Sequence, residues 1–565
     1  WNITSNEPPY ATNVSISANH NFTLDNLSEY YDYNDNESDV ETGTSFEWYE
    51  SSDNIIWTAL GINSTWLDSN YTNESWYYKF EVIPKNTEGT GDSVNSSVYQ
   101  VTALTETAGT YSGSYDEYGN LTIANGGSVT ITGAADFDGD TTILNGGTLN
   151  FGSQNIYLGS LSIKTGGSCT GTSETIYITA ENTSSGYAVD LDGTYTNNSG
   201  IINISSNTNT NLDLDPSSGE IYNLTIYLSD TGYDATLQNT CYINNNLNID
   251  KGELDTNSNL LDVSGKVRIG DGGDLDTIGD NDIHNFGSLE VQSGGTFQNG
   301  YYCKITDEDA SDYAINLDGT YTGVESDIIR IIGDRSGDSS KIDINPSSGS
   351  ISYFQLNLQD STDSVISQEA FFIKGFTNFE GTLDTNNKAV TTSSYIQILD
   401  GGTFDSAGDT ADHSFGSIDL DSGGEYIGSA DSKITITNET NDYAIDLDGA
   451  FTSNNNLIEI NTDPSGGSTN IDLNPDDSGS VYNVIIDVAG QTDNVVLQEA
   501  CTISNQLNID YGDFDTNNKT LTVTGELLIG GSGEFDGGDD TVDHSFGAID
   551  LNNGGNFIGS KESKI

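Results

Sequence analysis

Positively charged side chains are scarce in this sequence of 565 residues, which has 16 Lys and Arg against 87 Asp and Glu. The formal net charge of −71 excludes nucleic acid and anionic membrane surfaces as partners, because both would repel the chain. Cations are the natural partners of such a surface. Tyr, Phe, Ile, Leu and Val recur at regular intervals with Gly between them, a pattern that indicates a folded rather than a disordered acidic chain.

Long apolar runs, prolines and cysteines are also rare. No run approaches the roughly 18 apolar residues of a membrane helix, so we expect no membrane insertion in this segment, and no signal peptide opens the chain. With 7 prolines and no long helical pattern, the sequence favours an all-β fold. Cys169, Cys241, Cys303 and Cys501 are too few and too widely spaced for a disulfide framework. Cys241 and Cys501 share one register of a repeat in which the middle copy has Phe371, so we expect these thiols to be buried as small hydrophobic groups.

Secretion is indicated by Asn-x-Ser/Thr sequons, the acceptor pattern for N-glycosylation. The sequence holds sixteen of them, and they are densest in the front part of the chain. The candidate glycosylation sites are Asn2, Asn13, Asn21, Asn26, Asn36, Asn63, Asn70, Asn73, Asn95, Asn120, Asn182, Asn197, Asn203, Asn223, Asn438 and Asn518. We therefore expect an extracellular, cell-surface glycoprotein.

All five tryptophans lie in the first 76 residues, and this change in composition marks a domain boundary. Phe46 and Trp48 in SFEWYE alternate with polar neighbours, as do Tyr78, Phe80 and Val82 in SWYYKFEVIPKN, which predicts two strands. A segment of about 100 residues with a Trp on one central strand and a later aromatic strand predicts a β-sandwich. We assign residues 1–105 to this domain.

The stretches YDYNDNESDVETGTSFEWYE and WYYKFEVIPKNTEGTGDSVNSSVYQV carry a resemblance to a known class of modules. Over roughly residues 8 to 104 the chain resembles the Ig-like or PKD-like modules of archaeal and bacterial surface proteins. The resemblance implies an Ig-like β-sandwich at the front of the chain.

Residues 106–565 have a different texture, in which short strands of alternating apolar residues are separated by Gly-Gly, Asp-Gly and Asn-Gly turns. YAVDLDGTYT begins at Tyr187, YAINLDGTYT at Tyr313 and YAIDLDGAFT at Tyr443, which indicates a repeat of ~130 residues with about five coils each. A partial unit at 106–186 precedes units at about 187–312, 313–442 and 443–565, the last one incomplete.

One coil, about a fifth of such a unit, cannot bury its apolar face alone and must stack on its neighbours. The sequence therefore predicts a parallel β-helix, or β-solenoid, behind the Ig-like domain. A β-sandwich or propeller array is the alternative, because strand spacing alone does not fix the order of the strands.

An enzyme is the next alternative, since parallel β-helices host polysaccharide lyases and hydrolases. Lyase chemistry usually needs Arg or Lys to stabilise developing negative charge, and this segment has very few of either. Hydrolase chemistry needs two or three carboxylates in one groove, and Asp is so abundant that a chance pair is uninformative. We therefore expect no enzymatic activity and name no catalytic residue.

Three of the four histidines, His284, His413 and His544, share one register. Equivalent residues one unit apart would be separated by roughly 24 Å, too far for a shared metal or catalytic cluster. We expect each to be a turn residue that is hydrogen-bonded to a neighbouring Asp.

Calcium is the candidate cofactor, because Asp-rich turns with Gly present several hard oxygen ligands on a flexible loop. The best candidates are Asp136, Asp138 and Asp140 in ADFDGDTT, and Asp536, Asp539 and Asp540 in EFDGGDDT. The alternative is a solvated Asp-Gly turn, since neither stretch matches a complete calcium loop. No organic cofactor is expected.

Solenoid repeats behind an Ig-like module resemble archaeal and bacterial surface-layer, sheath, appendage and adhesin proteins. The resemblance implies an extracellular structural protein that self-assembles, head to tail or laterally, into a cell-surface filament, sheath or lattice. Copies of itself, and glycans as a second class, are the expected partners. An adhesin or glycan-binding rod is the alternative, followed by a polysaccharide-degrading β-helix enzyme. The sequence stops at Ile565 within a unit, which predicts either a longer natural chain or a last coil covered by something else.

Overall fold

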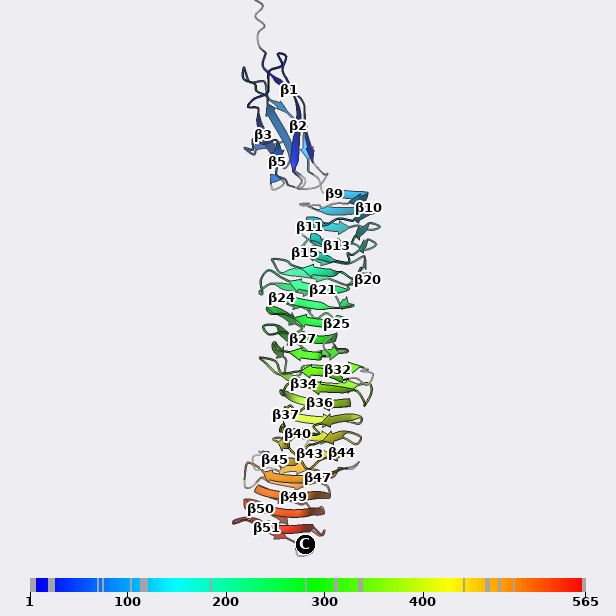
Figure 1. Ribbon diagram of the computed structural model, residues 1–565, viewed down its shortest axis with the longest axis vertical. Helices are drawn as coiled ribbons and strands as arrows, with labels where there is room; N and C mark the ends of the chain where they lie inside the picture. The colour runs from blue at the N-terminus through cyan, green and yellow to red at the C-terminus, as the bar shows by residue number, and fades with distance from the viewer. Residues whose placement is uncertain are drawn as a thin grey trace, which may run out of the picture. The chain divides into compact units, whose positions relative to one another are not determined.

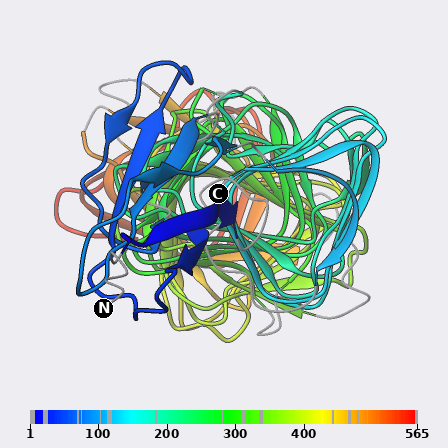
Figure 2. The same cartoon turned by 90° about the horizontal axis from the view of Figure 1, so that it is seen from above.

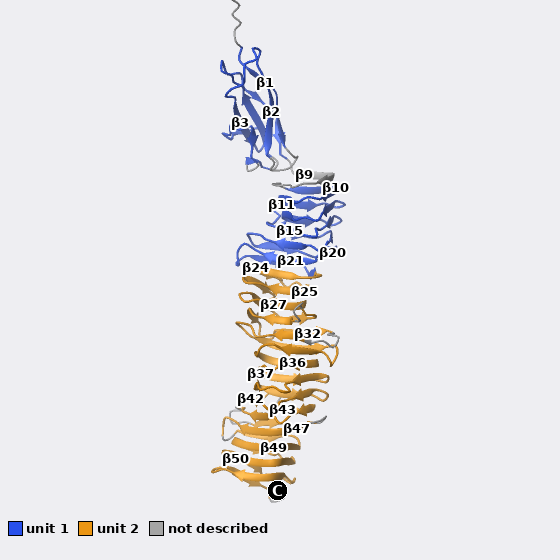
Figure 3. Ribbon diagram, viewed as in Figure 1, with its two compact units in different colours: residues 1–242 blue, residues 243–565 orange. Residues whose placement is uncertain are grey.

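The computed structural model describes residues 7–18, 26–68, 71–73, 76–101, 104–111, 120–182, 185–279, 282–308, 313–333, 339–439, 443–462, 468–475, 479–490 and 493–560. The chain divides into two compact units, residues 1–242 and 243–565 (Figure 3). The named elements are all β-strands. In the part of the chain that the structure describes, no helix has the length and hydropathy needed to span a membrane.

Two small antiparallel sheets form the front of the first unit. One sheet has the order β1 (Tyr10–Ala18), β2 (Leu27–Asn34) and β5 (Trp66–Leu67). The other has the order β4 (Thr58–Ala59), β3 (Ser45–Ser51), β6 (Tyr77–Ile83) and β7 (Val94–Asn95), with β8 (Tyr99–Gln100) also paired to β6. The two strands predicted around Trp48 and Phe80 are β3 and β6.

Both sheets contribute to one buried cluster of side chains. Trp48 and Phe80 are register partners across β3 and β6, and both are fully buried with Tyr78. Leu27 from the other sheet joins the same cluster. The indole Nε1 of Trp48 donates a hydrogen bond to the carbonyl oxygen of Ser64 at 3.0 Å, so the buried ring leaves no unpaired donor. The period-2 alternation of β6 thus buries one face of the sheet, as the sequence predicts.

A parallel β-solenoid of about 19 turns occupies residues from about 121 to 559 (Figure 1). Before it, β9 (Leu104–Tyr111) already pairs in parallel with β10. In the first unit its strands are β10 (Leu121–Ile131), β11 (Ala135–Ile143), β12 (Thr148–Phe151), β13 (Ile156–Ile163), β14 (Ser168–Thr170), β15 (Thr175–Ile178), β16 (Val189–Asp190), β17 (Thr194–Thr196), β18 (Ile201–Ile204), β19 (Thr210–Asp213), β20 (Ser218–Glu220), β21 (Asn223–Tyr227), β22 (Asp234–Leu237) and β23 (Cys241–Ile243).

The strands of the second unit also pair in parallel with one another. Its strands are β24 (Leu247–Asp255), β25 (Leu261–Ile269), β26 (Gly273–Asp276), β27 (Ile283–Val291), β28 (Thr296–Asn299), β29 (Tyr302–Ile305), β30 (Tyr313–Leu317), β31 (Thr320–Gly323), β32 (Ile328–Gly333), β33 (Ser339–Asp343), β34 (Ile351–Leu358), β35 (Ser364–Ser367), β36 (Phe371–Asp384), β37 (Val390–Ile398), β38 (Gly402–Asp405), β39 (His413–Phe415), β40 (Ser417–Leu420), β41 (Glu425–Ile427), β42 (Lys433–Ile436), β43 (Tyr443–Leu447), β44 (Ala450–Thr452), β45 (Leu457–Ile460), β46 (Ser468–Ile471), β47 (Gly479–Asp487), β48 (Asn494–Leu497), β49 (Cys501–Asp515), β50 (Leu521–Gly537), β51 (Ser545–Leu551) and β52 (Asn556–Gly559).

Each strand pairs in parallel with a strand one coil further along the chain, so the predicted solenoid is confirmed in place of a sandwich or propeller array. The register partners are close in sequence: Leu247 pairs with Val267, and Ile418 pairs with Ile445. In the view down the coils, the strands and turns of the second unit appear as loops around a common interior (Figure 2).

The interior of the coils is filled by one apolar side chain after another from alternate strand positions. In the second unit Phe404, Tyr426 and Phe451 are fully buried and stack in succession, with 5.1 Å between the ring centroids of each adjacent pair. Stacked rings of this kind add to the burial energy of each coil. The four cysteines are free and buried, which confirms the burial predicted for Cys241 and Cys501, and burial raises the pKa of each thiol.

An Asp-Thr-Asn turn recurs between coils. In the copy at Asp384, its carboxylate accepts a hydrogen bond from the backbone N–H of Asn386 at 2.8 Å. Asn386 and Asn387 have φ values of 50° and 60°, a left-handed conformation that Asn tolerates better than most residues. The same geometry at Asp255 and Asp515 explains why short polar residues fill these corners.

Candidate functional site

The outer face of the solenoid places residues of equal register side by side. In the ladder between β40 and β43, Asp419 is the register partner of Asp446. Parallel strands lie about 4.8 Å apart, so carboxylates in one register face each other across that distance. Acidic residues far apart in the sequence therefore become neighbours on this surface.

The first predicted calcium stretch, ADFDGDTT, lies in strand β11 rather than in a turn. Phe137 is buried and holds the segment in the ladder. The carboxylate of Asp140 accepts a hydrogen bond from the Ser160 hydroxyl at 2.8 Å. Among the described side chains, Asp136 and Asp140 join no group of three metal-ligating residues, and the side chain of Asp138 lies outside the described residues.

The second predicted stretch, EFDGGDDT, is split between the outer face and the interior. Asp539 is exposed, whereas Asp540 is only 4% exposed. One oxygen of Asp540 accepts a hydrogen bond from the backbone N–H of Asn518 at 2.7 Å. Its other oxygen contacts the Thr516 hydroxyl and lies 2.8 Å from Nε2 of His544. The side chain of Asp540 therefore forms hydrogen bonds inside a coil. It does not form the predicted metal-binding group with Asp536 and Asp539.

Three acidic groups on the solenoid could hold a metal ion, since one ligand atom from each member lies within 4.8 Å of the others. They are Asp190 with Asp192 and Asp213, Asp446 with Asp448 and Asp472, and Asp513 with Glu534 and Asp536. The first two groups occupy the same places in the YAVDLDG and YAIDLDG motifs and in the coil that follows each motif. Of the six predicted calcium ligands, only Asp536 belongs to one of these groups.

Electrostatics in two of these groups oppose full ionisation. Burial, and then the charges of Asp446, Glu499 and Asp448, raise the pKa of Asp472 to about 6, although the backbone N–H of Asn474 lowers it. At the third group, burial and the nearby charges of Glu534, Asp536 and Asp515 raise the pKa of Asp513 to about 7. A bound cation would relieve this repulsion, because it favours the charged form of each carboxyl.

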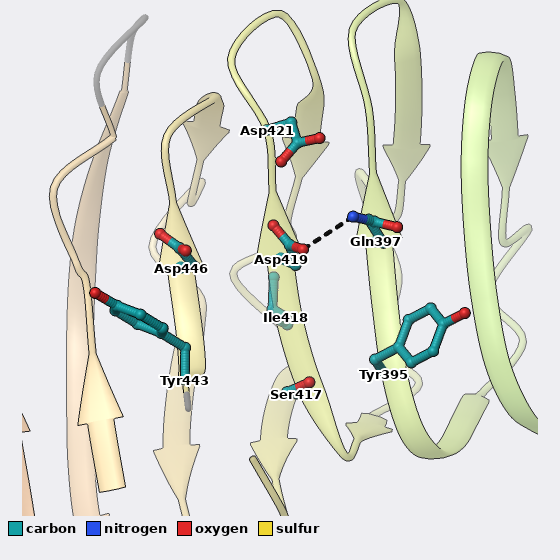
Figure 4. Close-up of a pocket in the computed structure, with 8 residues that line it drawn as sticks. All are labelled: Tyr395, Gln397, Ser417, Ile418, Asp419, Asp421, Tyr443 and Asp446. Atoms are coloured by element: carbon teal, nitrogen blue, oxygen red, sulfur yellow. Dashed lines mark hydrogen bonds between the residues drawn. The ribbon is translucent and has the colours of Figure 1, made fainter. Parts of the chain in front are cut away.

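A pocket of about 450 Å³ lies between the strands β37, β40 and β43 (Figure 4). It is lined by Tyr395, Gln397, Ser417, Ile418, Asp419, Asp421, Tyr443 and Asp446. Figure 4 shows the two tyrosines on opposite sides of Asp419. The side-chain amide of Gln397 donates a hydrogen bond to Oδ2 of Asp419 at 3.0 Å. Burial, followed by the charges of Asp421 and Asp446, raises the pKa of Asp419 to about 6.

The three histidines of one register are buried and serve the backbone locally. Nδ1 of His413 accepts a hydrogen bond from the N–H of Val390 at 3.2 Å, and His284 and His544 make the same contact one coil back. His544 is hydrogen-bonded to a neighbouring Asp as predicted, whereas Nε2 of His413 is 3.7 Å from Asp409 and has no hydrogen-bond partner among the described residues. Burial lowers the pKa of His413 to about 4, so the ring is neutral in the folded chain. The predicted position in a turn is wrong for His284 and His413, which lie in strands β27 and β39, whereas His544 lies just before β51.

The candidate glycosylation sites differ in accessibility. Those that are exposed are Asn13, Asn36, Asn63, Asn73, Asn95, Asn438 and Asn518. Those that are half-buried are Asn26, Asn120, Asn197, Asn203 and Asn223, and Asn182 is buried. Asn2, Asn21 and Asn70 lie outside the described residues. The exposed sites in both units keep glycosylation as a prediction.

The fold and these sites together define the chain as an all-β protein with a parallel β-solenoid that carries acidic surface groups. No protein-family model, curated protein or solved structure matches the chain.

Most members of the acidic groups and of the pocket escaped the sequence-based prediction. The Asp-x-Asp spacing of YAVDLDG and YAIDLDG was visible, but it gains meaning only beside the NLDL and NIDL strands of the next coil. Asp190 and Asp213, for example, are register partners between β16 and β19. An alignment of each motif with the strand one coil later would have found them.

Proposed function

We propose that the protein is an extracellular structural protein that forms part of a cell-surface filament, sheath or lattice. The observation that carries this proposal is the parallel ladder of about 19 turns, in which each coil hydrogen-bonds to the next through its backbone. Such an array is stabilised by nearest-neighbour interfaces and suits a scaffold. The front sheets, with one shared core around Trp48, fit an Ig-like or PKD-like module, and repeats of ~130 residues fit the recurrence of YA-x-x-L-D-G.

Calcium and self-association are parts of the same proposal. A net charge of −71 makes close contact between copies unfavourable unless cations screen it. The three acidic groups offer places where divalent cations would bind and lower that repulsion. We therefore expect association to require calcium.

Electron microscopy and sedimentation of the purified full chain test this proposal. We expect ordered filaments or sheets with calcium chloride and their dissociation on addition of EDTA. Particles that stay single with and without calcium would contradict self-assembly. Release of reducing or unsaturated sugar from polysaccharides would contradict the further prediction that the chain is not an enzyme.

An adhesin is the second candidate, and the pocket between Tyr395 and Tyr443 is the observation that favours it. Its volume of about 450 Å³ falls in the range of small-molecule sites, and aromatic side chains with a few polar groups are typical of the lining of such sites. A glycan array probed with single chains separates binding from assembly. Specific binding by chains that do not associate would favour the adhesin.

A further inference from the structure

Three copies of the YA-x-x-L-D-G motif place the same register positions in different chemical surroundings. We name them copy 1 (β13 and β16), copy 2 (β25, β27 and β30) and copy 3 (β37, β40 and β43). The ladder pairs Ser162 with Asp190 in copy 1, Glu290 with Asn316 in copy 2, and Asp419 with Asp446 in copy 3. These pairs share one register position, so the copies can be compared residue by residue.

Copy 1 neutralises its carboxylate with a lysine of its own. Nζ of Lys164 lies 2.5 Å from Oδ2 of Asp190, and the hydroxyl of Ser162 donates to the same oxygen at 3.0 Å. Lys164 follows Ser162 by two residues, so its position corresponds to that of Asp421 in copy 3. An ammonium group therefore occupies this position in copy 1.

Copy 2 also supplies an ammonium group, from a different strand. Nζ of Lys266 lies 2.6 Å from Oε2 of Glu290, and Arg268 is the register neighbour of Glu290. Burial alone would raise the pKa of Glu290, but the hydrogen bonds from Lys266 and Gln292 and the charges of Lys266 and Arg268 outweigh it and lower the pKa. The carboxylate is thus stabilised in its charged form.

Copy 3 has the carboxylates without the cations. Tyr395 and Gln397 are the register partners of Ser417 and Asp419, which are the places that Lys266 and Arg268 take in copy 2. Asp421 stands where copy 1 has its lysine. The pocket is lined by Asp419, Asp421 and Asp446 and by neither Lys nor Arg.

The walls of the pocket favour an organic cation over a metal ion. Calcium prefers a shell of oxygen ligands, whereas an alkylammonium group is attracted both to carboxylates and to aromatic rings. Tyr395 and Tyr443 lie on opposite sides of Asp419 (Figure 4), and about 450 Å³ is far more space than a bare ion fills. The two sister copies, each with a lysine ammonium beside the equivalent carboxylates, point independently to the same chemistry.

We propose that the pocket of copy 3 binds a primary ammonium group from outside the chain, held by Asp419, Asp421 and Asp446 between Tyr395 and Tyr443. The group takes the place that Lys164 and Lys266 fill in the other copies. A lysine side chain or an amino sugar presents this group. The inference does not depend on self-assembly, because binding is measured on single chains.

Isothermal titration calorimetry of the full chain tests the proposal at about pH 7, where the carboxyl of Asp419 is largely ionised. The ammonium probes are Nα-acetyl-lysine amide and glucosamine. Nα-acetyl-norleucine amide and N-acetylglucosamine are their uncharged counterparts. We expect saturable binding of at least one ammonium probe and none of either counterpart; the probe that binds more tightly identifies the source.

Substitutions locate the binding at copy 3. Asp419→Asn, and Tyr395→Lys combined with Gln397→Arg, should each weaken binding by about tenfold or more, the first by removing a carboxylate and the second by filling the pocket as in copy 2. The matched control is Lys266→Tyr combined with Arg268→Gln, which alters copy 2 and should leave affinity at copy 3 unchanged. Circular dichroism confirms that each variant is folded.

Two results would overturn the proposal. Equal binding of the ammonium probes by the wild type and by both copy 3 variants would mean general attraction to an acidic surface. Binding of calcium chloride alone, lost in Asp419→Asn, with neither ammonium probe bound, would make the pocket a metal site. Neither result bears on filament formation, which electron microscopy tests separately.

Discussion

The coils of copies 2 and 3 both bury aromatic rings in their interior, but their outer faces differ in charge. Inside, Phe297 and Tyr321 meet edge to face in β28 and β31, the strands that follow β27 and β30 of copy 2. Tyr426 and Phe451 stack in β41 and β44, the strands that follow β40 and β43 of copy 3. Outside, Lys266 neutralises Glu290, while Asp419 has no Lys or Arg beside it in its pocket. The comparison teaches that the interior maintains the coil, whereas the outer face can change its charge and its ligands without changing the fold.

The largest expected effect lies in the shared interior. Tyr426→Ala in β41, which follows β40 of copy 3, and Phe297→Ala in β28, which follows β27 of copy 2, should each destabilise their coils by about 3–5 kcal/mol, because both rings are almost fully buried. Native-state hydrogen exchange measures the free energy of local opening in β41 and β28. A cost below about 1 kcal/mol at either position would show that the two interiors are not equivalent.

The next largest effect is expected from removal of the Lys266–Glu290 ion pair on the outer face of copy 2. Lys266→Met should raise the pKa of Glu290 and cost about 1–2 kcal/mol, since a partly buried carboxylate loses its ammonium partner. The control is Lys374→Met, whose partner Glu325 is 93% exposed and 3.5 Å away, so that its loss should cost less than about 0.5 kcal/mol. Equal costs for the two substitutions would contradict the role given to Lys266.

Calcium binding is expected to differ between copies 2 and 3 at the neighbouring acidic groups. Copy 3 contributes Asp446, Asp448 and Asp472 to one group, whereas copy 2 has Asn316 where copy 3 has Asp446. Calcium at about ten times its Kd should stabilise the coils around Asp472 by about 1.4 kcal/mol, and Asp472→Asn should abolish that gain. Asn316→Asp should create a further calcium-dependent gain in copy 2, and thermal unfolding with and without EDTA measures both. An unchanged gain in Asp472→Asn would place the bound calcium elsewhere.

The smallest effect is the response of copy 3 to pH. Because the folded pKa of Asp419 is raised to about 6, this carboxyl binds more protons in the folded chain than in the unfolded chain between its unfolded pKa and about pH 6. It therefore destabilises the coil above about pH 6, and this destabilisation is lost as the pH falls toward the unfolded pKa. Asp419→Asn should stabilise the coil by about 1 kcal/mol at about pH 8 and by almost nothing at about pH 4.

The stability contribution of His413 has the opposite pH dependence to that of Asp419. The Asp419→Asn variant is therefore needed to separate the two contributions. Its pKa is lowered to about 4, so its contribution to stability is present above the unfolded pKa and is lost as the pH falls from there toward 4. Asp431→Asn, at an exposed position, is the matched control for the loss of one carboxylate. A gain in Asp419→Asn that is the same at every pH would contradict the raised pKa.

Much of the fold could be predicted from the sequence, because each inward residue needs only an apolar character and a period of two. Leu247 and Ile249 carry that signal within a single strand, as do Val267 and Ile269 in the next one. The turn predicted at Asp136 was wrong because Asp-x-Asp-Gly is a turn pattern only when no buried neighbour such as Phe137 holds it in a ladder.

The pocket could not be predicted in the same way. Asp419 and Asp446 meet only because β40 and β43 pair in one register, and a shift of one residue would have turned one of them inward. Local patterns do not state the register between coils.

The most direct test of the difference between copies 2 and 3 is a side-by-side titration of Asp419 and Glu290 in the full chain, by NMR of carboxyl-labelled protein with Asp419→Asn and Glu290→Gln for assignment. The account predicts a pKa of about 6 for Asp419 and a pKa for Glu290 that is lowered from the ordinary value of a Glu carboxyl. Equal pKa values for the two carboxyls would contradict it, because the outer faces of the two copies would then have the same electrostatics.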